Sequence, residues 1–224
     1  PPYSTTKAVW DQPLDWELVW EELKRMANPK SVFVFTATQP FTHKLISSNE
    51  EDFRYTLVWE KALPSGALNA SRKPMTKHED IVVFYEEAGA YNDGSEEMES
   101  GSEKVKRRNN RNEKFVYGIQ ETGTQTREGY RTSIIRAGRD QSGGLRHPTE
   151  KPVSLMKELI EMYSDRGDTV LDFTMGVGTT GVAAAKASRD FIGIEQDQEY
   201  YDIGKDRIEQ AKASQDHTKK FFDI

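Results

Sequence analysis

The sequence predicts an α/β fold built on a doubly wound, mostly parallel sheet, and three observations carry this prediction. Short apolar runs typical of buried strands lie at 31–36, 169–173 and 191–195. A glycine-rich turn joins the second of these runs to a helical pattern at 180–187. A strand, turn, helix and strand at this spacing form a βαβ unit, which requires a parallel pair of strands.

The first half of the chain supplies a helix and three strands. Asp15 is placed to cap a helix, and apolar residues follow it at helical spacing over 16–27. Strands are expected at 31–36, 53–59 and 81–85. The first is apolar nearly throughout, which indicates a sheet covered on both faces.

The second half begins with polar sequence and ends in regular elements. Residues 92–112 are nearly free of large apolar side chains and change from acidic to basic, which predicts a mobile insertion. Order is expected again from His147, with Pro152 as the first residue of a helix. A final amphipathic helix is expected at 199–213.

Composition limits the classes of protein that remain. The chain has 224 residues, a net charge of -6 and no cysteine, which excludes disulfides and thiolate zinc sites and agrees with a reducing compartment. No apolar run is long enough to span a bilayer, so we expect no membrane partner and a cytoplasmic location. The first residue is Pro1 rather than methionine, so we expect upstream residues in a longer protein.

The glycine-rich turn from Gly176 to Gly181 matches the pattern G-x-G-x-x-G between a strand and a helix. An acidic residue, Glu195, ends the next strand 23 residues after Asp172, where a βαβ nucleoside site places a carboxylate on ribose hydroxyls. Three interpretations are open: a plain structural turn, a dinucleotide site, or a site for S-adenosylmethionine (SAM). An acid at Asp172 would repel a pyrophosphate but suits the cationic methionine end of SAM, which we favour.

The stretch from Asp172 to Thr180 resembles the cofactor motif of DNA amino-methyltransferases, Asp-Pro-Phe-x-Gly-Ser-Gly-Thr. It departs from that motif at Phe173, Thr174 and Val177. The family's aromatic residue lies near the adenine, so either Phe173 takes that place or no residue does. The resemblance implies SAM as cofactor, a class I methyltransferase fold, and cofactor contacts from Asp172, Phe173, Thr174, Gly176, Gly178, Thr179 and Glu195.

A second motif, His147-Pro-Thr-Glu-Lys-Pro152, resembles the segment that precedes the cofactor motif in the circularly permuted β class of this family. The resemblance places Thr149 and Lys151 at the methionine end of the cofactor. Both residues lie just before a helix N-terminus, where donors can hold a carboxylate. The alternative is that Thr149 caps the helix and Lys151 is solvated.

A third motif, Pro1-Pro2-Tyr3, resembles the end of the family's catalytic sequence Asp/Asn/Ser-Pro-Pro-Tyr. Hydrogen bonds to a polar side chain and a proline carbonyl would make an exocyclic amine more nucleophilic. The Tyr3 ring would stack on the extruded base. The first residue of the motif is absent from the chain, and a proline-rich docking segment is the alternative.

The order of the three motifs is that of the β class, and it divides the chain. We expect a catalytic half at 1–64, a variable target-recognition region at 65–145, and a cofactor-binding half at 146–224. Basic residues in the middle region predict contacts with double-stranded DNA. The candidate DNA-binding residues are Arg72, Lys73, Lys104, Lys106, Arg107, Arg108 and Arg111. A solvated loop is the alternative at 104–111.

The predicted function is transfer of a methyl group from SAM to the exocyclic amine of a flipped base, adenine N6 before cytosine N4, within a bacterial or phage restriction-modification or related system. The alternatives are a nicotinamide-dependent oxidoreductase and a non-catalytic DNA-binding relative. The recognition sequence and the oligomeric state, with a homodimer as one option, stay open. No metal site is predicted.

Overall fold

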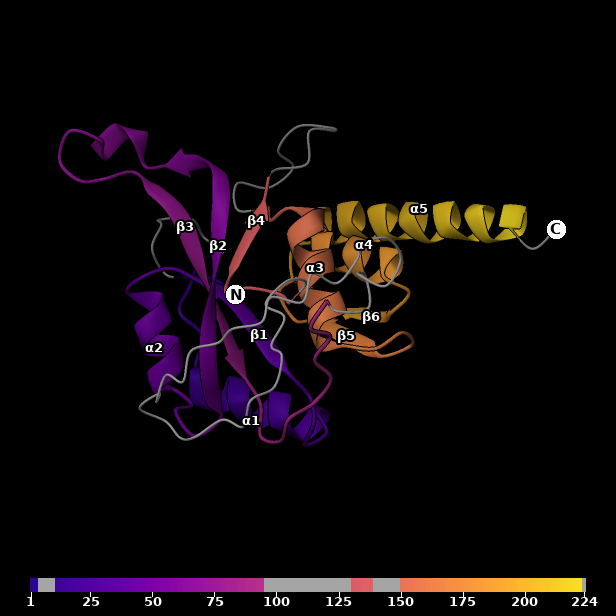
Figure 1. Ribbon diagram of the computed structural model, residues 1–224, viewed down its shortest axis with the longest axis horizontal. Coiled ribbons are helices and arrows are strands. Elements are labelled where there is room, and N and C mark those ends of the chain that lie inside the picture. Colours follow the sequence, from indigo (N-terminus) through magenta and orange to yellow (C-terminus); the bar gives the residue numbers. More distant parts are fainter. Residues whose placement is uncertain (4–10, 95–129, 139–149, 223–224) are drawn as a thin grey trace, which may run out of the picture. The chain divides into compact units, whose positions relative to one another are not determined.

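The computed structural model describes residues 1–3, 11–94, 130–138 and 150–222, with side chains described to residue 215 (Figure 1). One compact unit comprises Pro1–Tyr91 and Ser133–Ile224, and a second comprises Asn92–Thr132. In the second unit Arg131 donates from its backbone N–H to the carbonyl of Asp93 at 2.9 Å. Most of the predicted insertion at 92–112 lies outside the described residues.

The larger sheet has four strands, β1 (Phe33–Ala37), β2 (Phe53–Ser65), β3 (Thr76–Phe84) and β4 (Ile134–Ala137), in the order β1-β3-β2-β4. The strand β3 is antiparallel to both of its neighbours, and β4 pairs in parallel with β2. Three of the four strands therefore point in one direction, and β3 alone runs against them.

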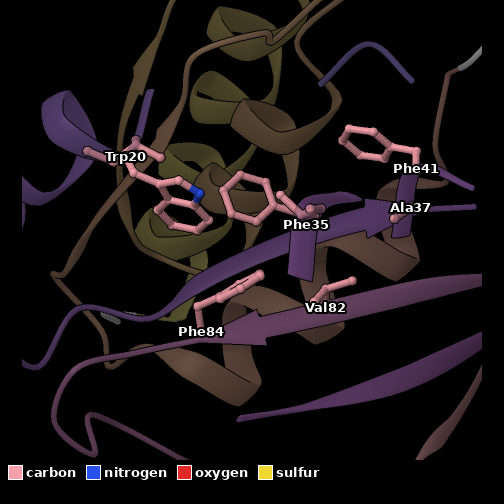
Figure 2. Packing of buried hydrophobic residues seen from close by; sticks show 8 residues of the cluster. Trp20, Phe35, Ala37, Phe41, Val82 and Phe84 are labelled. Atoms are coloured by element: carbon pink, nitrogen blue, oxygen red, sulfur yellow. The ribbon is translucent and has the colours of Figure 1, made fainter. Parts of the chain in front are cut away.

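Two helices cover one face of this sheet. The helix α1 (Trp16–Met26) begins where the Asp15 carboxylate accepts hydrogen bonds from the next turn, as predicted. The helix α2 (Phe41–Ser47) follows β1. Figure 2 shows their rings gathered over β1 and β3, with the centroid of Trp20 4.9 Å from that of Phe84. This aromatic core holds β1 against the helices.

The helix α3 (Val153–Tyr163) covers the opposite face, where Leu155 and Leu159 pack with Trp59 and Ile81. Alternate residues of β3 face the two cores, since Val82 belongs to the first cluster and Ile81 to the second. The prediction of a sheet covered on both faces is therefore confirmed.

The predicted βαβ unit is present. The strand β5 (Thr169–Asp172) leads through the glycine-rich turn to α4 (Thr179–Lys186), and β6 (Asp190–Gly193) pairs with β5 in parallel. The helix α5 (Gln198–Phe222) packs on α4, and Ile208 joins the cluster that both form with α3. The α/β class is thus as expected from the sequence.

Apart from the 3-10 helix η1 (Ala67–Asn69), two elements were not predicted, the seven-residue α2 and the four-residue β4. Both are too short to show a clear hydrophobic period in the sequence, and they are stabilised by packing on the sheet. The strand predicted at 81–85 begins earlier, at Thr76, because it pairs with the extended second half of β2. Pro152 caps α3 rather than opening it. Among the described helices, none has the length and apolar character needed to cross a membrane.

The range 65–145, predicted to recognise DNA, contains β3 and β4 of the larger sheet. The second half of β3 belongs to the core, since Ile81, Val82 and Val83 are fully enclosed. The role of the range 65–145 in DNA recognition stays a prediction.

Candidate functional site

The glycine-rich turn leaves the carboxyl end of β5 and enters α4. Gly176 and Gly178 have positive φ angles of 51° and 74°, which L-residues with side chains rarely adopt. The N–H of Met175 donates to the carbonyl of Ile194 at 3.0 Å and ties the turn to the segment after β6. A Cβ placed on Gly176 would meet no atom within 4 Å. The turn therefore presents a fixed backbone to an open space.

Asp172, the last residue of β5, orients this turn with both oxygens of its carboxylate. One oxygen accepts a hydrogen bond from the N–H of Thr174 at 3.0 Å, and the other accepts from Oγ1 of Thr180 at 2.6 Å. Thr180, which the sequence analysis did not select, thus contacts the acid directly. The carboxylate stays beside the turn, where it can also attract a cation.

Glu195 lies two residues beyond the end of β6 at Gly193, rather than on the strand as predicted. Its Oε2 accepts a hydrogen bond from the N–H of Gly176 at 2.9 Å, and its Oε1 accepts from the N–H of Asp197 at 2.9 Å. The carboxylate therefore joins the glycine-rich turn to the start of α5. Each oxygen keeps a lone pair for a further donor.

Side chains of α5 and of the segment before α3 support the turn from beneath. A Cβ placed on Gly178 would lie 2.8 Å from the Cα of Gly204, so the turn rests against a glycine of α5. Arg207 donates to the carbonyl of Val177 and pairs with Glu150 at 2.8 Å. The hydroxyl of Thr179 also donates to Glu150, at 3.4 Å. The second sequence motif thus holds the cofactor motif through Glu150.

A second group of polar side chains surrounds Tyr3. Its hydroxyl donates to Oγ1 of Thr36 at 2.8 Å and reaches Oε2 of Glu79 at 3.4 Å. Burial and the nearby Glu79 carboxylate raise the pKa of the Tyr3 phenol, which therefore stays protonated. Its ring stacks on Phe41, with centroids 5.2 Å apart. One ring face is thus occupied, and a stacked base has at most the other.

Glu79 connects Tyr3 to two lysines. Its carboxylate is buried on β3, and it pairs with Lys151 at 2.8 Å and with Lys61 at 3.3 Å. The Lys151 ammonium also lies over the rings of Tyr3 and Trp59, 5.3 Å and 5.7 Å from their centroids. Lys151 is therefore held in place by one carboxylate and two aromatic rings.

The Tyr3 group and the glycine-rich turn lie next to each other. Tyr3 and Phe173 pack against the same aromatic core, where the Phe173 ring meets Phe35 edge-on at 6.4 Å. Pro1 lies within electrostatic range of both Asp172 and Lys151. The Pro-Pro-Tyr segment thus lies within electrostatic reach of both other motifs. The role of Phe173 beside an adenine stays a prediction.

Several predicted residues cannot be placed in this site. Thr149 and the basic residues at 104–111 lie outside the described residues. Arg72 and Lys73 are described and exposed, and they lie between β2 and β3. Their contact with DNA stays a prediction.

Besides Thr180, further residues that hold the site were not selected from the sequence, among them Glu79, Gly204 and Arg207. Glu79 carried no clear signal, because it lies in a polar stretch, 76–80, ahead of the strand predicted at 81–85. Gly204 was visible, because a glycine within a helix costs stability and indicates close packing. Arg207 carried no signal that separates it from an exposed helical arginine.

Comparison with known proteins agrees with the three motifs. Residues 1–206 match the DNA methylase family of N6 and N4 methyltransferases. Two curated relatives are the type II methyltransferase M.HinfI of Haemophilus influenzae, 40% identical over 74 residues, and M2.DpnII of Streptococcus pneumoniae, 37% identical over 87 residues. These matches cover 33% and 39% of this chain but only 21% and 32% of the relatives' lengths.

A solved structure extends the likeness to the fold. The M1.HpyAVI–SAM complex superposes with a TM-score of 0.61 at 25% identity, covering 92% of this chain and 85% of the other. The fold is accordingly that of the class I methyltransferases, as the first motif implied. The family match includes Pro1 to Tyr3, Lys151 and the whole glycine-rich turn. The chain therefore belongs to the N6 and N4 DNA methylase family.

Proposed function

We propose that this protein transfers a methyl group from SAM to the exocyclic amine of a base extruded from double-stranded DNA. The adenine N6 amine is the preferred acceptor and the cytosine N4 amine the alternative. The observation that carries this proposal is the convergence of three sequence-distant motifs, Pro1–Tyr3, Lys151 and the turn at Gly176, around one region.

The residues at the turn fit SAM. Gly176 has no side chain and lies beside open space, so a nucleoside can approach the backbone closely at this position. Glu195 keeps acceptor capacity for ribose hydroxyls, and Asp172 supplies negative charge for the sulfonium and amino groups of SAM. When bound, SAM would supply the electrophilic methyl group. M1.HpyAVI, whose complex with SAM has the same fold, supports this choice.

Residues of the Tyr3 group would hold the acceptor base. The Tyr3 ring would stack on it, and a proline carbonyl would accept a hydrogen bond from its amine, which makes the amine nitrogen more nucleophilic. Because Tyr3 is fixed by Phe41, Thr36 and Glu79, it needs little ordering when the base arrives. No covalent intermediate is required.

A nicotinamide-dependent oxidoreductase is not proposed, because residues 1–206 match a DNA methylase family and Asp172 stands where a pyrophosphate would lie. A DNA-binding relative without activity differs from the proposed enzyme only in turnover. The proposed role in restriction-modification follows the relatives M.HinfI and M2.DpnII, which are type II methyltransferases. The cytoplasmic location and the oligomeric state stay predictions.

The deciding experiment incubates tritiated SAM and unmethylated duplex DNA with protein expressed from the complete reading frame. We expect label in the duplex, and chromatography of the hydrolysed bases then identifies N6-methyladenine or N4-methylcytosine. The variant Tyr3→Ala is the matched control, with SAM affinity measured by calorimetry. SAM and DNA binding without label would support the non-catalytic relative, and the absence of SAM binding would reject the proposed function.

A further inference from the structure

The strands β2 and β3 continue past the rest of the larger sheet as a two-stranded hairpin (Figure 1). We name residues 61–77 the hairpin arm. Ser65 pairs with Thr76, and the 3-10 helix η1 (Ala67–Asn69) forms the tip. Backbone hydrogen bonds close this tip, from Asn69 to Gly66 at 3.0 Å and from Arg72 to Asn69 at 2.9 Å. The arm is thus a regular hairpin with backbone hydrogen bonds rather than an irregular loop.

The charge of the hairpin arm is opposite to that of the chain. The whole chain carries a net charge of -6, yet residues 61–77 contain no aspartate or glutamate. Lys61 pairs with Glu79, and Lys77 pairs with Glu60 at 3.0 Å. Among the described ion pairs, none involves Arg72 or Lys73, and both residues are exposed near the tip. The arm therefore presents uncompensated positive charge to solvent.

Apolar side chains accompany this charge. Leu68 is 100% exposed at the tip, Leu63 is 77% exposed on β2, and Met75 is 38% exposed beside the return strand. A single exposed leucine needs no explanation, but three large apolar residues on one short basic element indicate a surface that is covered in use. Duplex DNA matches this combination, because its phosphates are anionic and apolar side chains can contact base edges or insert between base steps in its grooves.

The arm starts at the candidate site. Lys61 and Glu79 form its base, and Glu79 contacts both Lys151 and Tyr3. At about 3.3 Å per strand residue, the tip lies roughly 15–20 Å beyond Lys61. A duplex rises about 3.4 Å per base pair, so the arm could reach about five base pairs from an extruded base.

We infer that the hairpin arm binds duplex DNA about five base pairs to one side of the target base, with Arg72 and Lys73 on phosphates and Leu68 in a groove. This inference rests on the proposed function, and it names a part of the DNA that the Tyr3 group does not reach.

The test measures the affinity of full-length protein for a duplex with its methylated site at the centre. For Arg72→Gln/Lys73→Gln, two lost phosphate contacts predict a salt slope smaller by about two and about 30-fold weaker binding near 0.15 M salt. Leu68→Ser should weaken binding roughly tenfold.

The control variants are Arg166→Gln/Lys30→Gln, at exposed residues ahead of β5 and β1, and Leu18→Ser, at an exposed leucine of α1. These controls should bind as wild type does, and every variant should keep its SAM affinity.

Shortening the duplex distinguishes DNA contacts made by the hairpin arm from the general electrostatic attraction between the protein and DNA. Ending the duplex about two to three base pairs from the target base on one side removes the DNA that the arm would contact. This cut should weaken wild-type binding and abolish the difference between wild type and the arm variants, while the same cut on the other side should not. Arm variants that bind like wild type, in a protein that methylates DNA, would overturn the inference and leave the proposed function intact. A wild-type protein without SAM or DNA binding would overturn both. A dimer that Leu68→Ser dissociates would assign the tip to a second copy instead.

Discussion

The carboxylate of Glu79 accepts a hydrogen bond from Nζ of Lys151 at 2.8 Å, across 72 residues of sequence. Glu79 is 9% exposed, so this ion pair forms largely out of water. A buried carboxylate with two lysine partners and a tyrosine fixes the positions of all three groups. Glu79 thus acts as a positioning residue between the Pro-Pro-Tyr segment and the second sequence motif.

Replacing Glu79 with glutamine should therefore impair turnover more than cofactor binding. The amide keeps the shape of the side chain but removes the charge that holds Lys151 and Tyr3. We therefore expect kcat to fall at least about tenfold, and SAM affinity, to which the predicted Lys151 contact contributes, to fall less. Steady-state kinetics and calorimetry measure the two quantities. Glu87→Gln, at an exposed position after β3, is the control. Equal losses in both quantities would mean that Glu79 supports only the fold.

The variant Glu195→Ala tests the cofactor turn. Loss of the carboxylate should weaken SAM binding by about 1–3 kcal/mol, because hydrogen bonds to a charged acceptor are removed. If Glu195 holds a ribose hydroxyl, the loss should shrink for an analogue that lacks that hydroxyl. The same loss with both ligands would show that Glu195 acts only through the N–H of Gly176.

The variant Gly204→Ala tests the support beneath the turn. A Cβ at this position would lie 3.1 Å from the carbonyl oxygen of Gly176 and from the nitrogen of Gly178, so the turn must shift by a few tenths of an ångström. Alanine favours the helix by up to about 1 kcal/mol, which offsets the crowding. We therefore expect SAM affinity to fall several-fold with little change in Tm. Glu209→Ala, exposed on the same helix, should change neither.

Two substitutions separate the ring of Tyr3 from its hydroxyl. Tyr3→Phe keeps the stack on Phe41 and loses the bonds to Thr36 and Glu79, so it should keep more activity than Tyr3→Ala. Because burial raises the pKa of the phenol, the wild-type rate should show no ionisation of Tyr3 below about pH 10. A lower break in the pH profile that Tyr3→Phe removes would contradict this assignment.

Asp52 links stability to pH at a distance from the site. Burial acts to raise the pKa of this carboxyl, but Lys24, at 2.6 Å, and Asn49, at 3.0 Å, outweigh it and lower the pKa. A lowered pKa in the folded state stabilises the protein above the unfolded value of about 3.9, and this contribution is lost as the pH falls through the folded value.

Asp52→Asn should accordingly reduce the free energy of unfolding by about 1–2 kcal/mol at neutral pH. The difference from wild type should shrink as the pH falls below about 4, and it should be smallest below the lowered pKa of folded Asp52, where both chains carry a neutral side chain. Denaturant unfolding at several pH values measures it. Glu50→Gln, an exposed neighbour, should show no such dependence. A difference that is constant with pH would assign the effect to packing.

Elements whose causes are local can be predicted from the sequence alone. Asp15 caps α1 because a short polar side chain reaches the next N–H groups, and the glycine-rich turn can be recognised because only glycine tolerates its backbone angles. The parallel pairing of β5 with β6 followed from the length of the connection between them. For these features, residues within one turn or one crossover carry the information.

Contacts between segments that are distant along the chain depend on tertiary packing and could not be predicted from the sequence. The register of β3 against β1 and β2 places Glu79 where it meets Lys151, and a shift of one residue would turn it to the other face of the sheet. The packing of α5 on α4 brings Gly204 and Arg207 under the turn. Short elements such as β4 form because they make hydrogen bonds with a neighbouring strand, and the local sequence does not indicate that this neighbour is present.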